Sequence, residues 1–180
     1  MQKDFIDGAL ANPAAAAIVD SIRREIEAGG YAAVIFTQDD HDAKYAKTQE
    51  GEMLPIPHCI HGTPGCEIEP SLIGTAYGMY HAGTMKCAPK VVVKHSFGTR
   101  ELPKAVDDVL YKLSDSQGDH TEITFVGTCT DICVVSNALI LKAAYPDAPI
   151  FLKRDLCAGT TPENHQAAIT VMKSCQIIVE

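Results

Sequence analysis

The feature that most constrains the fold is an alternation along the chain of short apolar runs with longer amphipathic stretches. The short runs are rich in β-branched residues, as buried strands are, whereas the longer stretches repeat their apolar residues with a helical period. Five runs are expected to be strands: 32–37, 90–93, 122–127, 148–152 and 175–179. Strands that alternate with helices form a parallel sheet covered on both faces. The sequence therefore predicts a three-layer α/β/α fold with a mainly parallel, Rossmann-like sheet.

Helices are expected between these strands. The first is expected over 14–26, where Ile18, Ile22 and Ile26 share one face. Three later helices are expected at 100–113, 131–144 and 162–173. The segment 40–86 is different, because it is rich in Gly, Pro, His and Thr. A segment of this kind predicts a long functional loop.

Length and charge bound the class of protein. The 180 residues fit one domain over 1–180, and the net charge of -8 argues against a broad basic surface for nucleic acid. No apolar run approaches the roughly 20 residues that span a bilayer, and Met1 opens into polar sequence without a signal-peptide core. We therefore expect a cytoplasmic homo-oligomer with a small-molecule substrate and without nucleic-acid or membrane partners.

Reactive side chains follow three of the predicted strands. Ligands of an open parallel sheet bind beyond the carboxyl ends of its strands. Asp39 and His41 follow the first strand, Lys94 ends the second, and 128–133 follow the third. Cys133 then starts a helix, where the positive dipole end and a nearby ammonium favour a thiolate and lower its pKa. The alternative is that Cys133 only packs in the helix, and its position alone does not decide between the two.

A second group of residues has the composition of a metal site. Asp39 and His41 lie two residues apart at a strand end, and His58 joins them from the long segment. Three such ligands leave positions open for water or substrate. We expect a divalent metal, zinc in the first place. The alternative is a hydrogen-bonded cluster without metal.

Five segments of the chain resemble, in order, the motifs of the isochorismatase-like cysteine hydrolases, a family that includes nicotinamidases. The nucleophile motif of that family resembles 127–134, and its lysine segment resembles 93–98. Its N-terminal motif is similar to 1–10, and two further motifs are similar to 57–65 and 161–168. The resemblance covers nearly the whole chain and implies the same α/β/α fold.

This resemblance implies a role for each residue of the site. Cys133 is the nucleophile, and Lys94 supports it electrostatically. The main-chain amides of Cys129 and Cys133 form the oxyanion hole, and the peptide bond between Thr128 and Cys129 is cis. Phe5 lines the substrate pocket. Asp39, His41 and His58 match positions at which nicotinamidases bind a divalent metal.

The implied activity is hydrolysis of a small amide, in the first place of nicotinamide to nicotinate and ammonia, a step of NAD salvage. The metal set favours nicotinamide, because relatives that cleave isochorismate do not use such a metal. One alternative is a hydrolase of another small substrate, such as a different amide or isochorismate. The other is a catalytically inert binding homologue.

One departure from the family pattern lies at the N-terminus. The catalytic aspartate of the family would stand immediately before Met1, at the end of a central strand that this sequence lacks. Asp4 is the nearest acid, but it matches a second acidic position beyond that strand. We expect a native product that begins before Met1, because a missing central strand leaves backbone donors and acceptors unpaired. The alternative is a truncated, inactive chain.

Overall fold

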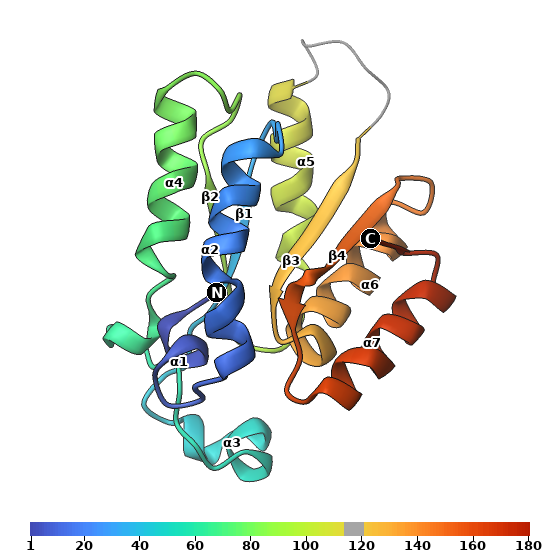
Figure 1. Ribbon diagram of the computed structural model, residues 1–180. Helices are drawn as coiled ribbons and strands as arrows, with labels where there is room; N and C mark the ends of the chain where they lie inside the picture. Colours follow the sequence, from blue (N-terminus) through green and yellow to red (C-terminus); the bar gives the residue numbers. More distant parts are fainter. Residues whose placement is uncertain (114–120) are drawn as a thin grey trace.

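Parallel strands form the middle of three layers in the computed structural model, which describes residues 1–113 and 121–180 (Figure 1). The strands in this part of the chain are β1 (Ile35–Asp39), β2 (Lys90–Lys94), β3 (Ile123–Thr128), β4 (Ile150–Ala158) and β5 (Ile178–Val179). The helices are α1 (Lys3–Ile6), α2 (Pro13–Ala28), α3 (Gln49–Met53), α4 (Pro70–His81), α5 (Glu101–Leu113), α6 (Val135–Ala144) and α7 (Pro162–Ser174).

Helices cover both faces of the strands, which confirms the α/β/α layers. On one face, Ile22 and Ile26 of α2 pack with Leu72 and Ala76 of α4 in one buried cluster. On the other face, α5, α6 and α7 bury a larger cluster around Leu152 of β4. Neither group of helices contains a segment, among the residues described, that is long and apolar enough to cross a bilayer.

The start of α2 shows how the sequence sets a local boundary. The side chain of Asn12 accepts a hydrogen bond from the main-chain N–H of Ala14, and Pro13 occupies the first turn. An Asn cap followed by proline satisfies amides that the helix itself leaves unpaired. Ile22 and Ile26 then point into the core, so the predicted helix is confirmed.

The prediction of one long loop over 40–86 was wrong. This segment contains α3 and the 12-residue helix α4. Gly74 and Gly78 lower the helix propensity of α4. The helix is stabilised because its apolar side chains pack against α2, and no local sequence pattern reveals this contact. Packing between helices therefore decides the conformation of this segment.

The strands of the described residues form two hydrogen-bonded groups. One group is β1 with β2, and the other has the order β3, β4, β5. A cavity of about 300 Å³ lies between the groups and is lined by both β1 and β3. Side chains of α2 and α5 cover it, including Ile22 and Val106. The edges of β1 and β3 therefore face a largely apolar slot, to which we refer below as the central slot.

Hydrogen exchange should distinguish strands with one neighbour from the strand with two. Phe151 and Leu152 of β4 pair with both β3 and β5, so their amides should exchange slowly. In β1, alternate amides point away from β2 towards the central slot and should exchange on the order of 100-fold faster. Exchange followed by NMR measures both sets. Uniform protection along β1 would show that another strand fills the central slot.

Candidate active site

The carboxyl ends of three strands bring Asp39, Lys94 and Cys133 together. Asp39 is the last residue of β1 and Lys94 the last of β2, and the two are paired in register. The Lys94 ammonium forms an ion pair with the Asp39 carboxylate and lies 3.3 Å from Cys133 Sγ. Both charged side chains are buried. The structure thus places the predicted lysine against the predicted nucleophile.

Burial dominates the electrostatics of the thiol. The loss of solvation and the negative charge of Asp39 raise the pKa of Cys133 to about 11, against the opposing effect of Lys94. The expected lowering of this pKa was therefore wrong, because it considered the helix end and the lysine but neither the burial of the thiol nor the Asp39 carboxylate. For Lys94, burial acts against the ammonium, but the charges of Cys133 and Asp39 outweigh it and raise its pKa.

Cys133 lies in a π-helical turn, Thr130–Val134, that precedes α6. The peptide bond between Thr128 and Cys129 is cis, as the resemblance implies. The carbonyl oxygen of Cys129 accepts hydrogen bonds from the main-chain N–H groups of Ile132 and Val134, each 3.1 Å long. The two residues expected to form an oxyanion hole, Cys129 and Cys133, therefore belong to one closed turn.

Asn137 supports this turn and was missed from the sequence. It is 2% exposed, and its side-chain amide donates to the carbonyl oxygens of Cys133 at 2.8 Å and Phe97 at 3.2 Å. Its side-chain oxygen accepts from the N–H of Thr99 at 3.1 Å. Asn137 thus ties the nucleophile to the segment after β2. Its only signal in the sequence is a polar residue among the apolar positions of a helix.

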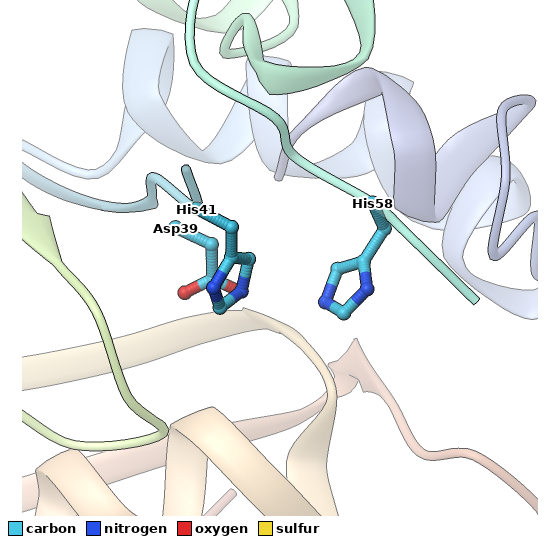
Figure 2. Close-up of side chains that lie close together, drawn as sticks. All are labelled: Asp39, His41 and His58. Carbon is cyan, nitrogen blue, oxygen red and sulfur yellow. The ribbon is translucent and has the colours of Figure 1, made fainter. Parts of the chain in front are cut away.

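The predicted metal ligands form a buried cluster. Asp39, His41 and His58 each offer a ligand atom, and these atoms lie within 4.8 Å of one another. Figure 2 shows the two imidazole rings on opposite sides of the site, with Asp39 beside His41. Nδ1 of His58 lies 2.9 Å from the carbonyl oxygen of Ile56, which leaves Nε2 as the ligand atom. Burial lowers the pKa of His41 and so favours the neutral ring that binds metals.

Glu50 lies beside both rings of this cluster and was also missed. Its carboxylate Oε1 lies 3.6 Å from Nε2 of both His41 and His58. Thr48 caps the short helix α3 that carries it, and Gly51 lets this helix approach the carbonyl oxygen of Tyr45, where a Cβ would overlap. The threonine cap was the available signal, but nothing in the sequence shows which way Glu50 points. Two carboxylates and two imidazoles are donors that suit zinc.

Main-chain hydrogen bonds join the segments that carry the two histidines. The N–H of His41 donates to the carbonyl oxygen of Cys59 at 3.0 Å, and the N–H of His61 donates to that of His41 at 2.7 Å. The buried ring of Tyr45 packs edge-on against both imidazoles, with centroid distances of 4.9 Å to His41 and 5.1 Å to His58. The segment after β1 and the segment around His58 thus form one unit.

A cavity of about 410 Å³ joins the two clusters. Cys133 and Cys129 line it together with Glu50 and His58. Phe5, the predicted pocket residue, also lines it and lies with its ring centroid 5.7 Å from that of His58. The remaining lining is largely apolar: Leu10, Ala11, Asn12, Pro13, Asp39, Leu54, Phe97, Ile132 and Thr160. A small, mostly apolar molecule held here would lie next to both the thiol and His58.

Comparison with known proteins gives one relative in sequence and several solved structures with a similar fold. The nicotinamidase of Schizosaccharomyces pombe is 28% identical over 122 residues, 68% of this chain and 51% of that enzyme, so the chain spans about half of its length. The nicotinamidase/pyrazinamidase of Bacillus subtilis is 28% identical, with 99% of this chain and 93% of that chain covered and a TM-score of 0.69.

A second solved structure shares the fold at lower identity. The pyrazinamidase of Pyrococcus horikoshii, solved in complex with zinc, is 24% identical, with 100% of this chain and 94% of that chain covered and a TM-score of 0.69. Among protein families, the isochorismatase domain matches residues 1–180. The match extends over all the motifs that carry the site. The chain therefore belongs to the isochorismatase domain family.

Proposed function

We propose that this protein is a cysteine hydrolase that cleaves the C–N bond of a small carboxamide, with nicotinamide as its substrate. The observation that carries this proposal is a cavity lined by both Cys133 and His58. The Lys94 ammonium lies 3.3 Å from the sulfur of Cys133, and His58 belongs to the cluster with Asp39 and His41. The nicotinamidases among its relatives support the choice of substrate. An inert binding homologue would not need a lysine buried against a thiol, because burying that charge is costly.

The chemistry starts at Cys133. Its sulfur attacks the carboxamide carbon, the C–N bond breaks, and ammonia leaves with the proton that the thiol gave up. Water then attacks the thioester, gives its hydroxyl to the acyl carbon and returns a proton to the sulfur. Because the pKa of the thiol is about 11, the sulfur is protonated at neutral pH and loses its proton during attack. Lys94, held by Asp39, stabilises the negative sulfur as it forms.

The turn that carries Cys133 also supplies stabilisation for the substrate oxygen. In the proposed mechanism, the main-chain amides of Cys129 and Cys133 donate to the oxygen that becomes negative as the sulfur attacks. Donors fixed in advance at such a position act on the transition state more than on the bound substrate. The hydrogen bonds from Asn137 and to the Cys129 carbonyl keep this turn in place.

The proposed divalent ion, zinc in the first place, would be held by Asp39, His41 and His58, with Glu50 beside both rings. These residues suit a divalent ion, because the three ligand residues are buried and close together. The Nε2 atoms of both rings also face the Glu50 carboxylate. When bound, the ion would supply an electrophile for the ring nitrogen of nicotinamide. The zinc complex of the Pyrococcus horikoshii pyrazinamidase supports this assignment. Phe5 would pack against the bound ring.

Removal of the nucleophile should abolish turnover. Cys133→Ala is expected to reduce ammonia release from nicotinamide by about 1,000-fold or more, because members of a catalytic unit act together. The control is Cys175→Ala, since Cys175 lies at the end of α7 and does not line the cavity. A coupled ammonia assay measures both variants, and circular dichroism checks that they fold. Turnover retained by folded Cys133→Ala would refute the assignment.

The histidine cluster should determine metal content. Elemental analysis is expected to find about one divalent ion per chain in the native protein. His58→Ala should lose the ion, whereas His61→Ala should keep it, because the side chain of His61 is 79% exposed and lies outside the cluster. Undiminished turnover of nicotinamide by protein stripped of metal would contradict a role for the ion in this reaction.

Two lysines of β2 allow a matched test of the buried ion pair. In protein stripped of metal, Lys94→Met leaves the Asp39 carboxylate buried without its counterion and should lower the free energy of unfolding by about 3–5 kcal/mol. Lys90→Met removes an exposed pair with Asp108 and should cost at most about 1 kcal/mol. Urea denaturation measures both. Equal effects of the two substitutions would show that the Lys94 pair is not solvent-shielded in the folded protein.

A further inference from the structure

The side chain of Gln2 holds the main chain of Asp39 from both sides. Its Nε2 donates to the Asp39 carbonyl oxygen at 2.8 Å, and its Oε1 accepts from the Asp39 N–H at 2.7 Å. The same Nε2 also donates to the carbonyl oxygen of Cys66 at 2.8 Å. Gln2 is 2% exposed, so no water competes for these bonds. One side-chain amide therefore satisfies both main-chain groups of Asp39 at the end of β1.

The side chain of Asp4 holds the loop that carries the histidines. Its Oδ2 accepts from the N–H of Cys59 at 2.6 Å, and its Oδ1 accepts from the N–H of Ala9 at 3.0 Å. Cys59 follows His58 directly and has a φ of 45°, a left-handed conformation that is unfavourable for a side chain with a Cβ. Because the carbonyl oxygen of Cys59 accepts from His41, the Asp4 carboxylate fixes a residue that joins both histidines.

The space around Asp4 is shaped for its carboxylate. A Cβ at Gly8 or at Gly65 would overlap the Asp4 side chain. Both of its oxygens are used by main-chain N–H groups, which argues that Asp4 serves to hold this loop and not to move protons during the reaction. A carboxylate that accepts from N–H groups forms stronger bonds than a neutral acceptor does. The left-handed conformation of Cys59 is the feature that this bond stabilises.

We propose that Gln2 and Asp4 are positioning residues for the ion site. This inference rests on the proposed function, because it concerns the divalent ion assigned there to Asp39, His41 and His58. Neither Gln2 nor Asp4 belongs to the ligand set, yet the first fixes Asp39 and the second fixes the loop between the two histidines. Residues that orient ligands in this way change metal affinity by about 10–100-fold when they are substituted.

Cobalt(II) titration followed by visible absorption tests this inference on the whole chain. Asp4→Asn keeps the shape of the side chain but has one acceptor oxygen where the native residue has two, so one of the N–H groups of Ala9 and Cys59 loses its partner. Gln2→Met keeps the length of the side chain and removes its hydrogen bonds to Asp39. Each variant is expected to raise the Kd for cobalt by about 10–100-fold. The control is Asp7→Asn, because Asp7 is exposed in the same segment and should bind as the native protein does.

A measurement without metal keeps the test independent of the ion. In the native protein, the short bond to the Asp4 carboxylate should shift the amide proton of Cys59 downfield in the NMR spectrum. Asp4→Asn should move this resonance upfield, and Asp7→Asn should leave it unchanged. Thermal unfolding identifies any variant that does not fold. If Gln2→Met is such a variant, Asp4→Asn alone carries the test.

The outcomes separate this inference from the function it rests on. Native protein that binds cobalt, with folded variants that bind it 10–100-fold more weakly, supports the positioning role. Folded variants that bind as tightly as the native protein would overturn the positioning role and leave the ion site intact. Native protein that binds neither cobalt nor zinc would overturn the ion site and the positioning role with it. Affinity that falls only in proportion to the loss of folded protein would also overturn the positioning role.

Discussion

The buried ion pair of Lys94 with Asp39 is the interaction on which both halves of the site depend. The two residues are 4% and 6% exposed, and either charge alone would be costly at that depth. Each member of the pair also contacts a different part of the site. The ammonium extends to the sulfur of Cys133, and the carboxylate extends to the cluster of His41 and His58. The thiol and the proposed ion site therefore share one electrostatic unit at the ends of β1 and β2.

Three buried or partly buried polar side chains hold the site residues through their main chains. Asn137 bonds the carbonyl oxygen of Cys133, Gln2 bonds both main-chain groups of Asp39, and Asp4 bonds the N–H beside His58. This arrangement leaves the reactive atoms free to meet substrate or ion. It also explains why polar side chains such as Asn137 and Gln2 are buried without a direct part in the proposed chemistry.

The sequence could predict the residues that follow strands, because the carboxyl ends of parallel strands meet whatever the details of packing. Asp39, Lys94 and Cys133 were found in this way. Glu50 and Asn137 were not, because their partners lie in segments that only the folded chain brings close. The helix α4 was missed because burial against α2 stabilises it. The pKa of the Cys133 thiol shifts in the direction opposite to the expectation. Its causes, the burial of the thiol and the nearby carboxylate of Asp39, arise only when the chain folds.

Asp39 is both the counterion of the lysine beside Cys133 and a member of the histidine cluster. This double role has an evolutionary consequence. A lineage that replaced His58 would give up the ion and still inherit a lysine paired beside its cysteine. A lineage that replaced Asp39 would lose the ion ligand and the counterion of Lys94 in one mutational step. Position 39 should therefore tolerate substitution least, since both properties depend on a single codon.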